Sequence, residues 1–108
     1  RKSGMKKAFL EYIEDEGILL RPNHMPIIGA DAIDFLSQVN DSSFTLTWEP
    51  KGSDVATSAD LGFTYGVYKL EQADTVLYGT YVSIWKKQKD GKWKWVLDTG
   101  NDGIGETR

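Results

Sequence analysis

Two aspartates stand where strand patterns could bring a carboxylate against aromatic side chains. Asp98 comes near the end of the last strand pattern, where simple alternation places it on the face opposite Trp93 and Trp95. In an apolar cavity, loss of hydration would raise the pKa of Asp98 and make it a general acid or base. The alternative, which we prefer at this stage, is that Asp98 starts the turn Asp98-Thr99-Gly100-Asn101 and binds backbone amides.

Asp60 is the second candidate acid or base. It shares a strand face with Thr64, and it would meet Tyr65 or Tyr81 only if a bulge changed the alternation. The simpler interpretation is an exposed aspartate in a turn after Ser58-Ala59, and it is the one we favour.

Aromatic side chains from three strand patterns could form the wall of a binding site. Such a wall suits an apolar ring that carries one polar group. The alternative is that most of these side chains fill the core. The four candidates for ligand binding are Trp48, Tyr65, Tyr81 and Trp85.

Two basic side chains near the first strand complete the set of candidate ligand-binding residues. Arg21 could hold an anionic ligand, but we favour an ion pair with an acidic residue of the preceding segment 14–16. His24, the single histidine, could carry protons at the mouth of a pocket. A histidine in an exposed loop more often has no such role, so this assignment is the weaker alternative.

The composition excludes several classes of site. With no cysteine and one histidine, the chain has neither a thiol nucleophile nor a cysteine or multi-histidine metal site. The net charge of −3 argues against a nucleic-acid partner. No apolar run approaches the ~20 residues of a membrane helix, and no glycine-rich phosphate loop occurs. We therefore expect no metal, no cofactor, no nucleic acid and no membrane partner.

The first 40 residues carry two helical patterns. Apolar residues at helical spacing run from Met5 to Ile13, and Gly17 is a candidate C-cap for this helix. A short strand, 18–20, follows. A second amphipathic pattern predicts a helix over 30–39, closed by 40–42.

From residue 44 the apolar period changes to two, which is typical of strands. We expect a strand over 44–49, a turn at 50–53, a strand region over 55–70 and a loop at 71–74. Another strand follows and ends in a hairpin at Asp90-Gly91. The last strand is expected to end near Asp98, and residues 100–108 are expected to be a loose tail.

This order of elements predicts an α+β fold in one domain, residues 1–108, with the helices on one sheet face. Gly62, Gly66 and Gly79 lie inside strand patterns and indicate a strongly curved sheet. Apolar side chains on both faces of the last strands predict a second contact, such as a homodimer. Which face is concave is left open by the pattern.

The chain starts at Arg1, and a helical pattern is already present at Met5. We therefore expect that the N-terminal helix is truncated at residue 1 if the start is a trimmed end. The composition is that of a soluble domain, and it fits the cytoplasm and an exported protein equally.

Four stretches carry a resemblance to a known superfamily: 5–10, 19–22, 28–33 and 90–98. They resemble the SnoaL-like branch of the nuclear-transport-factor-two-like (NTF2-like) superfamily, which includes ketosteroid isomerase and scytalone dehydratase. The likeness is closest to a bacterial domain family of unknown function. It implies a cystatin-like α+β barrel, in which a cone-shaped, curved antiparallel sheet packs against N-terminal helices. It also implies a pocket inside the sheet and dimers through the sheet.

The resemblance does not carry an activity, because the catalytic residues of ketosteroid isomerase cannot be placed on this sequence. The function we expect is binding of a small, largely apolar molecule inside the curved sheet. The first alternative is an isomerase, cyclase or dehydratase that uses aspartate and tyrosine acid–base chemistry on a ring compound. The second is a non-catalytic dimerisation module.

Overall fold

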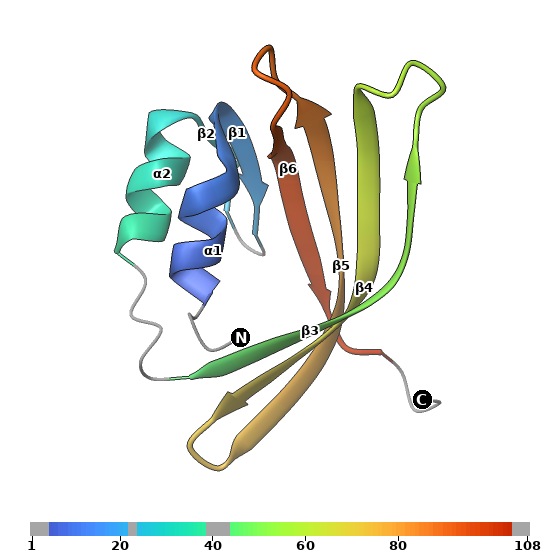
Figure 1. Cartoon of the computed structure of the whole chain (residues 1–108). Coiled ribbons are helices and arrows are strands. Elements are labelled where there is room, and N and C mark those ends of the chain that lie inside the picture. The colour runs from blue at the N-terminus through green and yellow to red at the C-terminus, as the bar shows by residue number, and fades with distance from the viewer. Residues whose placement is uncertain (1–4, 22–23, 39–43, 105–108) are drawn as a thin grey trace.

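The structure, a computed structural model, describes residues 5–21, 24–38 and 44–104 (Figure 1). Two short helices and two short strands precede four long strands, as the α+β prediction requires. Among the described residues, no helix is long and apolar enough to span a membrane. The elements are α1 (Met5–Tyr12), β1 (Ile13–Leu20), β2 (Ile27–Ile28), α2 (Ala30–Ser37), β3 (Thr45–Val55), β4 (Leu61–Gln72), β5 (Thr75–Lys87) and β6 (Trp93–Asp102).

The six strands form one curved sheet in the order β2-β1-β6-β5-β4-β3. All neighbours are antiparallel except β1 and β6, which run parallel, so the sheet is mixed rather than purely antiparallel. Figure 1 shows both helices on one side of the sheet, with β3 crossing below them. The expected curved sheet packed against N-terminal helices is therefore confirmed, and its concave face is the one toward the helices.

Two glycines allow the long strands to bend and pack closely. Gly79 of β5 pairs with Tyr68 of β4, and a side chain at Gly79 would overlap the Tyr68 ring and the backbone oxygen of Asn101. At Gly66, an added Cβ would lie 2.9 Å from the Cα of Pro50, which is too close for any other residue. Gly79 thus leaves the space in which the Tyr68 ring lies over β5.

The hydrophobic core lies between the helices and the β1–β6 part of the sheet. Its buried side chains come from β1, α2 and β6, so they fix α2 to the sheet. Partly buried side chains of α1 and β5, among them Phe9 and Trp85, pack against it. The core residues are Ile13, Leu19, Ala32, Leu36 and Trp95.

The boundary between α1 and β1 differs from the prediction. The helix ends at Tyr12, and Gly17 lies inside β1 rather than at a helix C-cap. Ile13 already pairs with Trp95 of β6, and the pairing is irregular between Ile13 and Ile18. The side chain of Ile13 occupies the space where Gly17 would carry a Cβ. Pairing with β6 and burial of Ile13 therefore override the helical spacing.

Three other boundaries also differ. The predicted turn at 50–53 lies inside β3, where a register shift absorbs it, and the chain instead turns between Val55 and Leu61. β6 extends to Asp102, so the first residues of the predicted tail are part of the sheet. The hairpin at Asp90-Gly91 is confirmed, with Gly91 at a φ of 88°. The second helix was expected to continue to residue 39, but α2 ends at Ser37 with Gln38 as its C-cap, and 39–42 lie outside the described residues.

Candidate functional site

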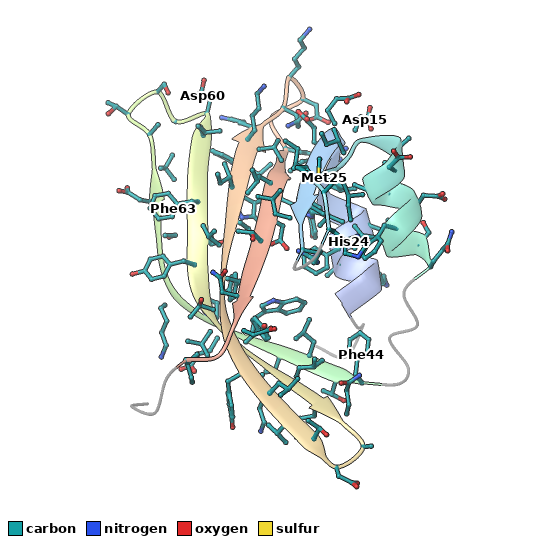
Figure 2. The ribbon with its side chains drawn as sticks, turned by 180° about the vertical axis from the view of Figure 1, so that it is seen from behind. Asp15, His24, Met25, Phe44, Asp60 and Phe63 are labelled. Carbon is teal, nitrogen blue, oxygen red and sulfur yellow. The ribbon has the colours of Figure 1, made fainter. Side chains whose placement is uncertain are left out.

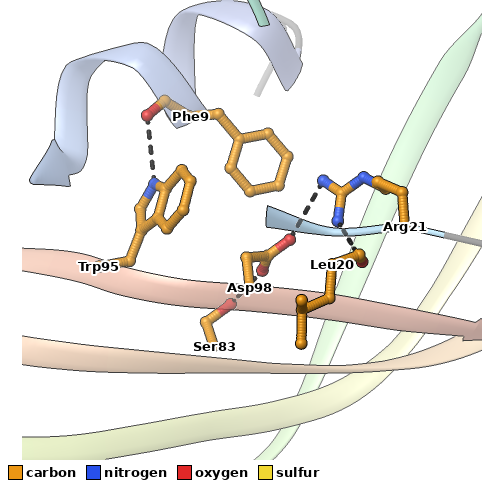
Figure 3. Close-up of polar contacts among 6 residues, drawn as sticks. All are labelled: Phe9, Leu20, Arg21, Ser83, Trp95 and Asp98. Atoms are coloured by element: carbon orange, nitrogen blue, oxygen red, sulfur yellow. Dashed lines mark hydrogen bonds and ion pairs between the residues drawn. The ribbon is translucent and has the colours of Figure 1, made fainter. Parts of the chain in front are cut away.

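Asp98 lies on the concave face because the pairing of β5 with β6 contains a bulge. Trp95 pairs with Trp85, and Asp98 pairs with Ser83, so three steps along β6 match two along β5. Ser83 and Trp85 are two residues apart on β5 and share a face. Asp98 and Trp95 therefore share that face as well (Figure 3). The prediction that Asp98 lies opposite Trp95 is wrong, because it assumed unbroken alternation.

The carboxylate of Asp98 is buried in a small polar cluster (Figure 3). The Ser83 hydroxyl donates to its Oδ1 at 2.6 Å, and Arg21 Nη2 lies 3.3 Å from its Oδ2. Arg21 Nη1 also donates to the backbone oxygen of Leu20 at 3.2 Å. Asp98 is thus held by a side chain of β5 and by that of Arg21, the residue after β1. The preferred interpretation, a turn residue that binds backbone amides, is wrong.

The electrostatic state of Asp98 reflects two opposing effects. Burial removes water from the carboxylate and raises the pKa of Asp98 above its ordinary value. The hydrogen bond from Ser83 and the positive charge of Arg21 oppose this shift without cancelling it. Asp98 therefore has the raised pKa that the sequence analysis associated with an apolar cavity.

Tyr68 adds a second polar point on the same face. Its hydroxyl donates to a carboxylate oxygen of Asp102 at 2.9 Å. The ring can reach this position because Gly79 leaves room for it. Burial and the neighbouring Asp102 both raise the pKa of Tyr68.

Tyr81 belongs to the same group of polar side chains. Burial raises the pKa of Tyr81, and the negative charge of Asp98 raises it further. Tyr68 and Tyr81 therefore keep their phenolic protons at neutral pH, and both hydroxyls can donate hydrogen bonds.

These side chains line a cavity of about 310 Å³ between α1 and the concave face. The apolar part of the cavity lining consists of Phe9, Phe44, Leu46, Trp48 and Leu70. The polar part includes Arg21, Tyr68, Gln72, Tyr81, Asp98 and Asp102. We call the first set the apolar wall and the second set the polar floor.

Phe9 joins the helix to the apolar wall. Its ring makes edge contacts with Trp48 at a centroid distance of 5.7 Å and with Trp95 at 5.6 Å. The Trp95 indole N–H donates to the backbone oxygen of Phe9 at 3.1 Å. Since Trp95 is buried in the core, this contact fixes the helical side of the cavity.

Four of the predicted site residues meet in this cavity: Arg21, Trp48, Tyr81 and Asp98. For Arg21, the favoured pairing with an acidic residue of segment 14–16 is wrong, because Asp98 is its acidic partner. The leucine that precedes Arg21 pairs with Thr99 of β6, and this register brings Arg21 beside the end of that strand.

Two predicted wall residues lie elsewhere. Tyr65 is on the outer face and is 47% exposed, with its ring near that of Phe63. Trp85 is on the concave side but packs against Tyr12, and its indole N–H donates to Thr64 at 3.2 Å. Neither side chain lines the cavity beside Asp98.

Asp60 and His24 also lie apart from the cavity (Figure 2). Asp60 is exposed in the β3–β4 turn, where the Ser58 hydroxyl donates to it at 2.5 Å. This is the turn position that we favoured. His24 is exposed and its ring meets that of Phe35 edge-on at 5.8 Å, near α2.

The sequence did not point to several other residues of the cavity, among them Phe9, Tyr68 and Asp102. Phe9 is visible in the sequence only as part of the apolar stripe of a helix, and Asp102 falls in the predicted tail. Tyr68 opposes Gly79 across two strands, so its role depends on a register that the pattern does not give. A search for aromatic residues opposite strand glycines could have found Tyr68.

The arrangement can bind an apolar body and orient a polar group on it. A buried carboxyl with a raised pKa beside two phenols could also move a proton. Among the described residues, no group of three His, Asp or Glu side chains could hold a metal ion.

No protein-family model and no curated protein matches the sequence. Solved structures do match. A ketosteroid isomerase-like protein from Erwinia carotovora atroseptica is similar at a TM-score of 0.76 and 18% identity, covering 92% of this chain and 82% of its own. An NTF-2 like protein of unknown function from Shewanella oneidensis has a TM-score of 0.67 and 16% identity, covering 88% and 81%.

An NTF2-like protein with a cystatin-like fold from Novosphingobium aromaticivorans is similar at a TM-score of 0.66 and 11% identity. The match covers 94% of this chain and 71% of that protein. At these identities the likeness concerns the fold alone. The chain has the NTF2-like, cystatin-like fold that the sequence resemblance implied.

Proposed function

We propose that this NTF2-like domain binds a small, largely apolar molecule in the cavity between α1 and the concave sheet face. The observation that carries the proposal is the cavity lining, which combines aromatic and aliphatic side chains with a few polar ones. Ligand sites in proteins combine mostly apolar linings with a few polar groups that orient the ligand, and the smallest have volumes of about 300 Å³. A compact ring compound suits a cavity of this size.

The buried polar cluster supports binding rather than simple packing. An ion pair out of water contributes little net stability, and apolar residues of similar volume often stabilise a fold better. Asp98 and Arg21 nevertheless occupy the cavity floor, where they can orient a polar group of a ligand. A core that served packing alone has no need of them.

Ligand binding can be tested by thermal unfolding with a panel of mono- to tricyclic ring compounds. A bound compound at ten times its Kd stabilises the fold by about 1.4 kcal/mol, which raises Tm by several degrees. Trp48→Ala opens the apolar wall and should abolish the rise, whereas Tyr65→Ala on the outer face should keep it. If no compound raises Tm, or if both variants respond like the wild type, the proposal fails.

Acid–base catalysis is the second candidate function, favoured by the raised pKa of Asp98 and its nearness to Tyr81. The reaction would be an isomerisation, cyclisation or dehydration of a ring compound, with Asp98 moving the proton and a tyrosine stabilising the developing oxyanion. Asp60 lies in an exposed turn outside the cavity, which makes it a matched control.

The test of catalysis is turnover of a panel of steroid-like and polyketide-like ketones. Asp98→Asn should lower kcat/KM by about 10²–10⁴-fold, the usual loss for a general acid or base, while Asp60→Asn should not. Equal turnover by the wild type and Asp98→Asn would exclude Asp98 as the catalytic group.

We also propose that the domain forms a homodimer through its outer sheet face. Several apolar side chains of β4 and β5 lie exposed there, among them Leu61, Phe63 and Tyr65. A dimerisation module without a ligand is the remaining alternative, and the ligand panel separates it from the binding function.

A further inference from the structure

We infer that the ligand of this cavity is a neutral molecule with a hydroxyl group, and that the Arg21–Asp98 pair selects it over carboxylate and ammonium analogues. The inference rests on the proposed binding function. The Arg21–Asp98 pair would contact the polar end of the ligand, and the apolar wall would contact its ring.

Arg21 and Asp98 can form more hydrogen bonds than they make with each other and with their neighbours in the described part of the chain. A carboxylate can accept about four hydrogen bonds, and among the described residues Asp98 accepts from Ser83 and Arg21. A guanidinium has five N–H donors, and among the described residues Arg21 has acceptors on Leu20 and Asp98. Both side chains line the cavity, so each offers unused capacity to a ligand.

The distance between the two partners suits a single oxygen atom that contacts both. Arg21 Nη2 and Asp98 Oδ2 lie 3.3 Å apart, so one oxygen atom can lie within hydrogen-bond distance of both. A hydroxyl is the simplest group that donates and accepts at once. It would donate its proton to Asp98 and accept an N–H from Arg21, and it would leave the ion pair intact.

The charges of the polar floor disfavour a charged ligand. The positive charge of Arg21 is already compensated by Asp98, and Asp102 adds a further negative charge on the polar floor. A carboxylate ligand would lose water and meet two like charges. An ammonium ligand would also lose water, and Arg21 would repel it, although Asp98 and Asp102 would attract it. The buried pair thus disfavours ions of either sign and leaves a neutral polar group as the best fit.

The ring of the ligand would lie against the apolar wall. Arg21 follows β1 and Asp98 lies on β6, whereas Leu46 and Trp48 lie on β3, which β5 and β4 separate from β6. Phe9 lies on α1. A hydroxyl on the pair therefore directs the rest of the molecule toward aromatic and aliphatic carbon. A compact ring alcohol satisfies both sides of the cavity at the same time.

The test compares four probes with one ring body: indane, indan-2-ol, indane-2-carboxylate and 2-aminoindane. Binding is followed at pH 7.5 by ¹H–¹⁵N spectra through the indole N–H signal of Trp48, identified with Trp48→Phe. Indan-2-ol should bind about tenfold more tightly than indane, the usual gain from a hydrogen bond to a charged group. The carboxylate and the ammonium compound should both bind more weakly than the alcohol.

The four affinities distinguish a failure of the selectivity from a failure of ligand binding itself. If indane binds but the carboxylate or the ammonium compound binds as tightly as the alcohol, the selectivity is wrong and the binding function stands. If none of the four probes shifts the Trp48 signal, the binding function itself is overturned, and the inference falls with it.

Two variants test the pair directly. Asp98→Asn keeps the shape of the side chain but leaves Arg21 uncompensated, so the ratio of carboxylate to alcohol affinity should rise at least tenfold. Arg21→Gln leaves Asp98 uncompensated and should instead raise the relative affinity of 2-aminoindane. Asp60→Asn, in the exposed turn, should leave all ratios unchanged. Unchanged ratios in both pair variants would overturn the assignment, and the wild-type series decides it even if a variant does not fold.

Discussion

Asp98 is the residue on which the site depends, because it is a charged group in a place with little water. Two effects on its pKa oppose each other: burial favours the neutral acid, while Ser83 and Arg21 favour the carboxylate. The net effect is a pKa above the ordinary value of 3.8. A raised pKa means that the folded protein holds this proton more tightly than the unfolded chain does.

This linkage predicts how stability depends on pH. Below pH 3.8 the acid is protonated in both states, and its contribution to stability is fully present. As pH rises through the folded-state pKa, the carboxyl must ionise in its buried position, and that contribution is lost. The free energy of unfolding of the wild type, minus that of Asp98→Asn, should therefore fall as pH rises from about 4 and then level off.

Urea unfolding between pH 3 and pH 8 measures this difference. Asp60→Asn, which removes a carboxylate in the exposed β3–β4 turn, serves as the control. A difference between wild type and Asp98→Asn that rises with pH would show that pairing with Arg21 outweighs burial.

The sequence allowed the right residues to be named here but not their partners. Asp98, Arg21, Trp48 and Tyr81 were all candidates, since their side-chain chemistry is visible in the chain. Their meeting in one cavity depends on a single bulge between β5 and β6, and regular alternation does not reveal a bulge. The same bulge explains why Asp98 lies on the face of Trp95, whereas regular alternation predicted the opposite face.

At the scale of elements, α1 is tied to the sheet by one polar contact and a set of aromatic contacts. The Trp95 indole N–H donates to the backbone oxygen of Phe9, near the middle of the helix. Phe9 then contacts Trp48 of β3 on its other side. The helix is short, so it depends on tertiary packing for its stability.

Replacement of Trp95 with Phe should therefore destabilise the fold. The change removes the hydrogen bond to Phe9 and leaves a carbonyl without its donor, at a cost of about 1–3 kcal/mol. Trp93→Phe, at the half-buried start of the same strand, is the matched control and should cost less. Urea unfolding compares the two variants, and equal losses would contradict the role given to the Trp95–Phe9 contact.

Element boundaries were predictable where local chemistry decides them. The Asp90-Gly91 hairpin follows from a turn that needs a positive φ, and Gly91 has one. The end of α1 was mispredicted because the helical spacing of apolar residues continues to Ile13, which belongs to β1. Pairing between residues 82 positions apart decides that boundary, and no local pattern contains this information.

For the whole molecule, the sequence was sufficient to predict the fold. Helices before a run of alternating strands, with glycines inside the strands, lead to a curved sheet covered on one face. The sequence could not show which face is concave, because both faces carry apolar side chains. The structure assigns the concave face to the cavity and leaves the outer face uncovered (Figure 2).

That outer face leads to the prediction of a homodimer. Phe63 is 41% exposed and Tyr65 47% exposed, side by side along β4, and a groove beside Phe63 is lined by Val82 and Ile84 of β5. Such a patch on a regular sheet can meet its own copy around a two-fold axis, and a stable dimer needs about 800 Å² per partner.

Sedimentation equilibrium at micromolar concentration should give a dimer for the wild type and a monomer for Phe63→Lys, because the lysine would place two like charges at the two-fold contact. Met25→Lys is the matched control, since Met25 is 82% exposed in the loop before β2, and it should leave the dimer intact. Phe63→Lys should still bind indan-2-ol, because the cavity lies on the opposite face of the sheet. A monomeric wild type, or a dimer that Met25→Lys dissociates and Phe63→Lys does not, would move the interface away from the outer face.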